Sequence, residues 1–445
     1  MMAQGFAVDS LGGGDELPAR TSVVVIGGGI AGAMTALSLA EDGVPVLLIE
    51  KGRVAGEQSG RSWGWCRKMD RDIRELPLAV AALPLWEDMN RRIGGESGFR
   101  RSGIVYLNAD EKEEAARGAW LRAAEPFGLD TRLISAAEVD TLLPGSNRRW
   151  RSALYTPSDG VAEPRLVVPA VLRAVRRLGG QVVEHTPVIG LETAGGKVDA
   201  VVTPQGRVAC DAVVLAGGAW SGRFLAGLGL RLPQLKVIAS VLRTEAAPPA
   251  AGRSDIAVWG AGFGFHRRLD GGYTIGYGNN LHEIVPDSFR YLVDFLPTIP
   301  VAAGDLHFSI GRSFATEARH LGARSTAARF AGAGENAPPP TGRFLSRARR
   351  ALDRAYPAFA ELREAARWAG LIDVLPDVLP VISNVETLPG LTLATGFSGH
   401  GFAIGPAAGR LAADLVTGRT PIVDPAPFRY GRYTDGSRPR PQTAV

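Results

Sequence analysis

The segment from Thr21 to Glu50 constrains the fold more than any other part of the chain. A β-branched run over residues 21–26 has the continuous apolar character of a buried parallel strand. Glycines turn the chain at residues 27–29, and alanines and leucines then recur at helical spacing over residues 30–41. A second apolar run covers residues 44–50. This order of strand, glycine turn, helix and strand predicts one βαβ unit, and therefore an α/β protein with a parallel sheet.

Three glycines of this unit have the spacing G-x-G-x-x-G, namely Gly27, Gly29 and Gly32. The first permits a tight turn, the second lets the backbone approach a pyrophosphate, and the third lets the helix pack on the strand. The helix begins with Ile30 and Ala31, where free N–H groups and the positive dipole end favour phosphate. Glu50 ends the second strand, where its carboxylate can accept both hydroxyls of a ribose. In this context the pattern predicts a dinucleotide site.

The sequence favours FAD over a nicotinamide cofactor. A second glycine pattern, Gly260, Gly262 and Gly264, lies between β-like runs and lacks the helix that a nucleotide site needs. A flavoenzyme reduced by a pyridine nucleotide would need a second complete unit. One nucleotide site and a long β-rich insertion therefore indicate FAD with an organic reductant.

Length and composition narrow the class further. With 445 residues, 45% of them hydrophobic and 21% charged, the chain fits a globular enzyme with two interleaved domains. The formal net charge is +5, but only five of the fifty basic residues are lysines. The arginines are scattered among acids and do not form a basic run, so we expect no nucleic-acid partner.

Two cysteines, Cys66 and Cys210, are too few for a disulfide framework or a thiolate metal cage. We therefore expect a reducing compartment and no metal. Residues 1–20 contain acids and glycines without an apolar core, unlike a secretory signal, and no later stretch is long and apolar enough for a membrane span. The expectation is a cytoplasmic protein whose residues 1–20 are disordered.

The expected elements divide into two interleaved domains. A Rossmann-like FAD-binding domain is expected over residues 21–95, 155–232 and 366–430. A β-rich substrate domain, an antiparallel sheet with helices, is expected over residues 96–154 and 233–365, and residues 431–445 form a C-terminal tail. Helices are expected over residues 75–92, 112–127, 165–178, 343–355 and 403–416.

Four segments occur along the chain in the same order as in a known family: Gly27–Gly32, Gly56–Arg61, Leu215–Trp220 and Gly396–Phe402. They resemble the D-amino-acid oxidase superfamily of flavoenzymes, which includes sarcosine, glycine and D-amino-acid oxidases and dehydrogenases. Residues 51–61 (KGRVAGEQSGR), 216–221 (AGGAWS) and 421–428 (PIVDPAPF) are similar to bacterial L-amino-acid deaminases and their soluble relatives. The resemblance spans nearly the whole chain from Ser22.

The resemblance implies which residues hold the flavin. Those expected to line the flavin ring and ribityl chain are Gln58, Ser59, Gly60, Arg61, Trp63, Gly64 and Trp65, and Val188 would contact the adenine. The other cofactor candidates are Lys51, Gly217, Trp220, Gly396, Gly399, His400, Gly401, Phe402 and Ala403. The glycine turn at 396–401 leads into a helix, whose N-terminus would stabilise negative charge on a reduced flavin. His400 would either strengthen this field or only bind the loop backbone.

The superfamily transfers a hydride from the carbon that bears an amine to flavin N5, and water hydrolyses the resulting imine. The resemblance therefore implies oxidation of the C–N bond of an amino acid or amine. Oxidation of a hydroxy acid or a biosynthetic intermediate on the same fold is the alternative, and a flavoprotein that only relays electrons is a third. The electron acceptor is expected to be oxygen or a quinone- or dye-like molecule, and the oligomeric state stays open.

Departures from the family patterns refine these expectations. Gly370 aligns where sarcosine oxidases carry the cysteine that links FAD, so the flavin should be noncovalent. Ala403 replaces a lysine used in oxygen activation, so reaction with oxygen should be slow. In the strand where membrane-bound deaminases carry an arginine for the substrate carboxylate, His266 and Arg268 would share one face.

Together with Arg67, His266 and Arg268 are the candidate catalytic residues for binding the substrate carboxylate. A solvated or ion-paired surface role for the arginines is the alternative interpretation, and it is the more common one for arginine. Trp63, Trp65 and Trp259 either form a cage around the substrate or pack in the core.

Overall fold

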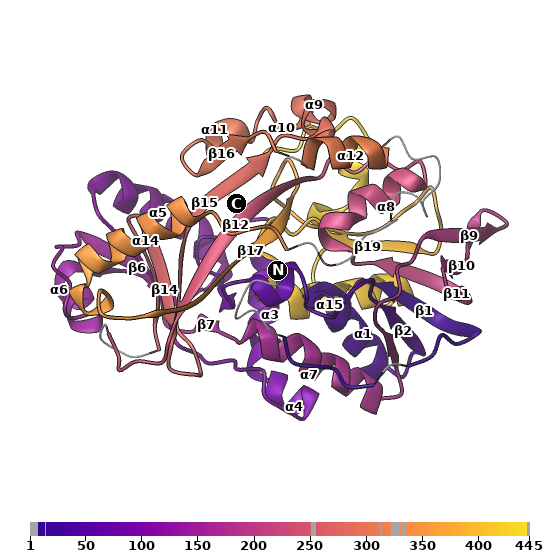
Figure 1. Cartoon of the computed structure of the whole chain (residues 1–445), viewed down its shortest axis with the longest axis horizontal. Helices are drawn as coiled ribbons and strands as arrows, with labels where there is room; N and C mark the ends of the chain where they lie inside the picture. Colours follow the sequence, from indigo (N-terminus) through magenta and orange to yellow (C-terminus); the bar gives the residue numbers. More distant parts are fainter. Residues whose placement is uncertain are drawn as a thin grey trace.

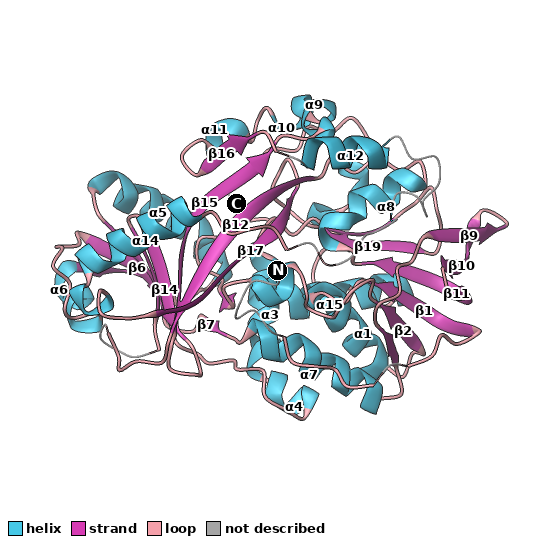
Figure 2. Ribbon diagram, viewed as in Figure 1, coloured by secondary structure: helices cyan, strands magenta, loops and turns pink. Residues whose placement is uncertain are grey.

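The computed structural model describes residues 8–13, 15–250, 255–311, 313–321, 330, 335 and 337–442. These residues fold around two large β-sheets with helices between and around them (Figures 1 and 2). A short two-stranded ribbon, β3 (Trp65–Cys66) with β7 (Gly160–Val161), completes the sheets. The predicted α/β class, with a Rossmann-like part and a β-rich part, is confirmed.

The first sheet has the order β18-β19-β11-β1-β2-β8, and a hairpin of β9 and β10 extends from β11. Its central pairs are parallel. Val23 and Val25 of β1 face one core, whereas Val24 and Ile26 face another, so the strand is buried on both sides as its apolar run requires. The strands of this sheet are β1 (Arg20–Ile26), β2 (Val46–Ile49), β8 (Gln181–Val183), β9 (Gly190–Ala194), β10 (Lys197–Thr203), β11 (Gly206–Leu215), β18 (Val381–Asn384) and β19 (Leu391–Thr395).

Helices cover one face of the first sheet, at the lower right of Figure 1. They are α1 (Ile30–Glu41), α3 (Leu76–Glu87), α4 (Met89–Ile93), α7 (Pro164–Arg177) and α15 (Gly401–Thr417). The α1 and α15 helices pack closely, because Gly409 lets α15 approach the backbone of Met34, where a Cβ would lie 2.5 Å from it. Two short helices, α2 (Gln58–Arg61) and α8 (Ser221–Gly227), lie at the ends of the strands.

The second sheet is mainly antiparallel and has the order β17-β12-β15-β14-β13-β4-β6-β5, with β16 beside β15. Its strands are β4 (Ile104–Asn108), β5 (Arg132–Ser135), β6 (Ser152–Thr156), β12 (Leu235–Thr244), β13 (Ala257–Gly260), β14 (Phe263–Arg267), β15 (Tyr273–Glu283), β16 (Leu306–Ser309) and β17 (Glu364–Val374). The helices associated with this half are α5 (Glu111–Ala124), α6 (Ala136–Leu142), α9 (Pro286–Arg290), α10 (Leu292–Phe295), α11 (Ile299–Ala302), α12 (Ser313–Leu321) and α14 (Gly342–Ala355).

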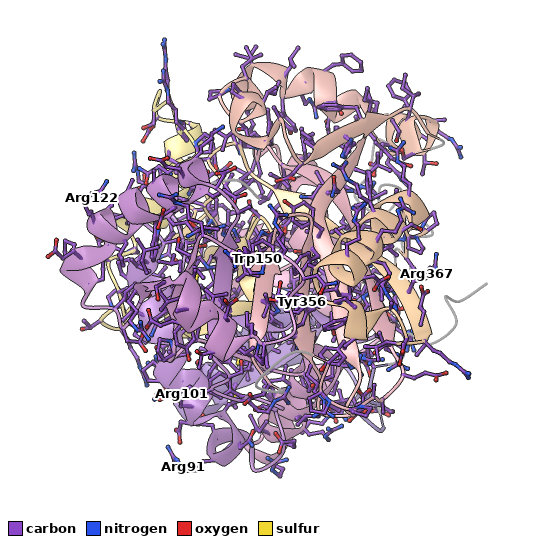
Figure 3. All side chains as sticks on the ribbon, turned by 90° about the vertical axis from the view of Figure 1, so that its left-hand side faces the viewer. Arg91, Arg101, Arg122, Trp150, Tyr356 and Arg367 are labelled. Carbon is purple, nitrogen blue, oxygen red and sulfur yellow. The ribbon has the colours of Figure 1, made fainter. Side chains whose placement is uncertain are left out.

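One face of the second sheet buries a dense aromatic core beneath α14. Trp150 and Tyr356, both labelled in Figure 3, pack against Phe263 with ring centroids 6.1 and 6.2 Å away. Phe265 and Phe359 lie in the same cluster, 4.7 Å apart. Because side chains alternate along a strand, the opposite face, which carries Gly264, is left for the cavity described below.

Three of the four arginines labelled in Figure 3 are paired with acids. The pairs are Arg91 with Asp88, Arg101 with Glu87, and Arg367 with Glu364. In the parts of the chain with described coordinates, no helix is both long and apolar enough to cross a bilayer.

Several expected boundaries differ from the structure. Part of the N-terminal segment expected to be disordered is packed in place, because Leu11 is buried and Asp15 accepts hydrogen bonds from Arg176 and the Val182 N–H. The helix expected over 75–92 is divided at Asp88, whose ψ of 0° departs from the helical value. Residues 366–374, placed in the first domain by the expected boundary, pair with β12 in the second sheet as part of β17.

Candidate functional site

A cavity of about 600 Å³, called the main cavity below, is lined by both sheets. It extends from the β1–α1 turn, past α2 and the start of α15, to β12, β15 and β17. All but three of the predicted cofactor residues line it: Gly27, Gly29, Ile30, Ala31, Glu50, Lys51, Gln58, Ser59, Arg61, Trp63, Gly64, Trp65, Val188, Gly217, Trp220, Gly399, His400, Gly401, Phe402 and Ala403. The exceptions are Gly32, Gly60 and Gly396.

The three exceptions are glycines because of close packing behind the lining. A Cβ on Gly32 would lie 2.0 Å from the Gly27 carbonyl oxygen, and one on Gly60 would lie 2.2 Å from the Ala55 carbonyl oxygen. Gly396 has φ +74°, and a Cβ there would lie 2.1 Å from Leu375. These positions shape the cavity walls without reaching the lumen.

The β1–α1 turn forms a backbone cradle that fits a pyrophosphate. Gly27 has φ +113°, and a Cβ there would lie 2.4 Å from the Ala216 carbonyl oxygen. Ser59 accepts a hydrogen bond from the Ile30 N–H at 2.9 Å. The other N–H groups in the first turn of α1 have no partner within the helix and face the cavity end at Gly29 and Ala31.

Glu50 lies beside this cradle and is held by two backbone donors. Its Oε2 accepts from the Gly28 N–H at 2.7 Å, and its Oε1 accepts from the Gly52 N–H at 2.8 Å. Burial raises the pKa of Glu50, although Lys51 and the two N–H groups oppose this rise. Each carboxylate oxygen keeps a lone pair for a further donor, which fits a ribose hydroxyl.

Two polar networks fix the middle of the cavity. Glu57 contacts the Lys51 Nζ at 2.5 Å and accepts from the Trp220 Nε1 at 2.8 Å. Asp373, buried on β17, accepts from the Gln58 Nε2 at 3.0 Å. It also accepts from the N–H of Gly396 at 2.9 Å and from Gln234 at 3.1 Å. Burial raises the pKa of Asp373, and these donors oppose the rise.

The N-terminus of α15 enters the cavity two residues earlier than expected, at Gly401. His400 precedes it, and its Nδ1 lies 3.1 Å from the fully buried Glu75 Oε2. Burial and the charge of Arg71 lower the pKa of His400, and Glu75 opposes this shift. Burial alone would raise the pKa of Glu75, but His400, Arg71 and Arg67 lower it overall. His400 is therefore held by a buried carboxylate at the wall of the cavity.

Three arginines gather around Tyr106 at the sheet end of the cavity; we call Arg67, Arg71 and Arg117 the arginine cluster. The guanidinium carbons of Arg67 and Arg117 lie 5.6 and 4.7 Å from the Tyr106 ring centroid. Arg67 donates to the carbonyl oxygens of Met69 and Asp70.

Carboxylates lie beside each member of the cluster. Arg117 lies 3.4 Å from Asp70, Arg71 lies 3.6 Å from Glu75, and the charge of the buried Asp159 acts on Arg71 and is acted on by Arg67. Burial lowers the pKa of Arg71 to about 10, which still leaves it charged at pH 7. Among the described residues, the buried Nη1 of Arg71 has no hydrogen-bond partner. One buried donor is thus available to a ligand.

Aromatic side chains form the wall beside this cluster. Trp63 lies 5.6 Å from both Trp65 and Trp259, measured between ring centroids. Trp259 also stacks on Tyr277 at 5.0 Å. Gly264 and Gly276 make room for Trp63, since a Cβ on either would lie 2.6 or 2.5 Å from its ring. The three tryptophans line the main cavity and also pack on one another.

Of the three candidate catalytic residues, only Arg67 lines the cavity. The His266 Nδ1 lies 3.2 Å from the Arg267 carbonyl oxygen, and burial lowers the pKa of His266 to about 4. Arg268 is paired with Asp270 at 2.5 Å. The expectation that His266 and Arg268 border the substrate with Arg67 is therefore not met. His266 lies near the end of β14 and Arg268 directly after it, and neither lines the cavity. No group of three metal-binding side chains is found among the residues with described positions.

Comparisons with known proteins agree with this architecture. Residues 22–415 match the sequence profile of the family described as FAD dependent oxidoreductase. The chain belongs to this family. It is 29% identical to the glycine oxidase of Pseudomonas aeruginosa over 427 residues, covering 91% of this chain and 97% of that protein. The structure of an L-amino acid deaminase from Proteus myxofaciens, in complex with anthranilate, is 32% identical with a TM-score of 0.89, covering 97% of both chains.

A D-amino acid dehydrogenase from Bradyrhizobium diazoefficiens is 24% identical over 384 residues, covering 83% of this chain and 79% of that protein. The predicted family and the dependence on FAD are confirmed. The predicted activity, FAD-dependent oxidation of a C–N bond, is confirmed at the level of the reaction class.

Several residues of the site were not singled out from the sequence: Glu57, Glu75, Tyr106, Arg117, Asp373 and, above all, Arg71. Arg71 follows Arg67 by four residues in a loop, and Arg117 is an arginine in the otherwise acidic stretch EKEEAARGAW. Both arginines could have been considered once Arg67 was a candidate for binding the substrate carboxylate. Neither sequence position indicates on its own that the two segments meet in the fold.

Proposed function

We propose that this FAD-dependent oxidoreductase oxidises an α-amino acid whose carboxylate binds the arginine cluster. The observation that carries the proposal is the gathering of Arg67, Arg71 and Arg117 at the cavity, together with the buried Arg71 Nη1, which makes an ion pair with Glu75 at 3.6 Å but no hydrogen bond among the described residues. A substrate carboxylate would accept a hydrogen bond from this donor. Charge-assisted bonds of this kind are bidentate and directional, so they also orient the substrate.

The aromatic wall supports a large apolar side chain on that amino acid. Trp63, Trp65 and Trp259 present ring faces and edges to the cavity. The Trp65 Nε1 is buried and has no hydrogen-bond partner among the described residues, so it is a second donor for a polar group of the ligand. These rings exclude water from the region between the arginine cluster and the start of α15.

FAD, when bound, accepts the hydride from the carbon that bears the neutral amine. The protein holds this cofactor through the glycine cradle, Glu50 and the α15 N-terminus. Neither cysteine lines the cavity, and Gly370 packs on Arg61, where its Cβ would lie 3.3 Å away, which supports noncovalent FAD. The protein needs no strong base, because substrate positioning and the field of the α15 N-terminus supply what the transfer requires.

The test is anaerobic bleaching of the flavin by three matched compounds. Phenylalanine, phenyllactate and phenethylamine share one aromatic side chain and differ in the amine or the carboxylate. We expect one enantiomer of phenylalanine to bleach the flavin at the lowest concentration and phenethylamine to need far more. Bleaching by phenyllactate and not by phenylalanine would establish hydroxy-acid oxidation in place of this proposal. The cytoplasmic location and the oligomeric state stay predictions.

A further inference from the structure

A second, smaller cavity of about 230 Å³ lies at the end of the main cavity, which we call the apolar cavity. The two cavities share two lining residues, Asn280 and Asp305. The helices α9, α10 and α11 and the strand β16 cover it, at the top of Figure 1. Its other polar side chains are few: His282 is already bonded to the Lys236 carbonyl oxygen and to Ser288.

The two cavities lie on the same face of the second sheet. Side chains on one face of a strand recur every two residues. On β12, Leu235 and Val237 line the apolar cavity, and Ala239 and Val241 line the main one. The neighbouring strands continue the pattern, with Gly370 and Ile372 in the main cavity and Val374 in the apolar one, and with Asn280 followed by His282. The apolar cavity therefore extends the main cavity along three adjacent strands.

The outer mouth of the apolar cavity is unusually apolar for a surface. Nine of the twelve exposed large hydrophobic residues in the described chain lie between residues 289 and 314: Phe289, Leu292, Val293, Leu296, Ile299, Val301, Phe308, Ile310 and Phe314. Four of them, Phe289, Leu292, Ile299 and Phe308, line the cavity itself. A contiguous exposed apolar surface marks an interaction site. Such a mouth favours an apolar ligand over a water-soluble amino acid.

We propose that the apolar cavity binds a lipid-soluble quinone, which accepts the electrons left on the flavin by amino-acid oxidation. The inference rests on the proposed function for the source of these electrons. The quinone ring would lie against Val237 and Val374, with its carbonyl oxygen towards Asn280 and its apolar tail at the Phe289 and Leu292 mouth. Two electrons and two protons convert its two carbonyl groups to hydroxyls, and the quinol leaves by the same mouth.

The polar end of the apolar cavity suits a quinone carbonyl. In the described structure, the carboxamide of Asn280 makes no side-chain hydrogen bond, and it is largely buried. Burial raises the pKa of Asp305, although His307 and Arg347 oppose the rise. An amide N–H and a carboxyl group that is more readily protonated can both donate to a quinone oxygen. These two side chains also form the boundary with the main cavity, where the electrons arise.

The experiment compares two tryptophan substitutions on one helix. Ala302 lines the apolar cavity, and its neighbour Val301 is exposed and does not. Holoenzyme variants A302W and V301W would be reduced with dithionite and mixed in a stopped-flow instrument with decylubiquinone or with ferricyanide. We expect A302W to lower the rate constant for decylubiquinone at least tenfold, with ferricyanide and flavin content unchanged, and V301W to match the parent.

A second pair of variants on α10 keeps the test valid if A302W does not fold. Leu292 lines the mouth of the apolar cavity and its exposed neighbour Val293 does not, so we expect L292D to lower the decylubiquinone rate constant and V293D to match the parent. Parent-like decylubiquinone rates in both A302W and L292D would overturn the proposal. So would a loss in A302W confined to flavin bleaching by long amino acids, since the cavity would then hold the substrate side chain. Dithionite reduction needs no amino acid, so failure of amino acids to bleach the flavin would remove only the proposed function.

Discussion

The two ends of the main cavity are formed by different parts of the chain, backbone groups at one end and side chains at the other. At the nucleotide end, Gly27, Gly29 and the first turn of α1 present backbone, and one carboxylate, Glu50, completes the site. At the sheet end, side chains from a loop and a distant helix converge on Tyr106, and no backbone feature defines the ligand. A site made of backbone is lost when a side chain is added to one of its glycines, but it is retained when neighbouring side chains change. A side-chain site depends on individual charges and can change specificity without losing its cofactor.

The largest effect should follow from filling the backbone cradle. In Gly29→Val, the Cβ would lie 3.1 Å from Ser59 Oγ and the branches would project into the space for the pyrophosphate. We expect purified protein without bound flavin, measured as the absorbance ratio of flavin to protein. The matched control is Gly190→Val on β9, where a Cβ meets nothing within 4 Å. Parent-like flavin content in Gly29→Val would contradict the assignment of the cradle.

The arginine cluster should instead control substrate affinity while flavin stays bound. Truncating one member of a desolvated charge pair costs about 2–5 kcal/mol, and about 1.4 kcal/mol corresponds to a tenfold change. Arg71→Ala and Arg117→Ala should therefore raise the half-saturating amino-acid concentration at least tenfold.

Flavin content is the internal control for these variants, and Arg268→Ala is the external one. Arg268 is paired with Asp270 outside the cavity, so its loss should leave the half-saturating concentration unchanged. A larger effect in Arg268→Ala than in Arg71→Ala would return the carboxylate site to β14.

The nucleotide end could be predicted from the sequence because its determinants are local. Gly27 to Glu50 form one continuous unit, so spacing alone places the turn, the helix start and the carboxylate. The arginine cluster could not, because Arg71 and Arg117 are distant in sequence and meet where α5 packs beside β4 and its Trp120 donates to the Arg71 carbonyl oxygen. The position along β14 at which the cavity ends could not be predicted either, because it depends on where Trp63 fills the space over Gly264.

His266 tests whether a buried residue outside the main cavity affects the stability of the fold without affecting substrate affinity. Burial lowers the pKa of His266 in the folded protein to about 4, below its ordinary value of 6.5, so the unfolded chain binds more protons between these two values. The free energy of unfolding should therefore fall as the pH drops through this range, by at most about 3 kcal/mol. In His266→Gln this part of the decrease should vanish, whereas the half-saturating amino-acid concentration at pH 8 should stay unchanged.

Denaturant unfolding at pH 6.5 and pH 4.5 measures the difference, and His185→Asn at an exposed position is the control. An unchanged pH dependence in His266→Gln would mean that burial of this imidazole does not destabilise the fold in acid. Loss of substrate affinity in the same variant would return His266 to the site.

The smallest expected effect concerns oxygen, and it separates the α15 end of the cavity from the arginine cluster. Ala403 lines the cavity near the start of α15, and its carbonyl oxygen accepts from the Trp86 Nε1 at 2.7 Å. Burial and Arg71 lower the pKa of the neighbouring His400, so this end offers mainly the helix dipole, with alanine and not lysine at position 403. Charge that develops on oxygen during its reduction is therefore weakly stabilised here. We expect stopped-flow reoxidation of the reduced enzyme by oxygen to be slower than by an artificial dye, and Ala403→Lys to narrow the gap. Equal rates for oxygen and dye in the parent would contradict this prediction, because the helix dipole would then stabilise the developing charge without a lysine at position 403.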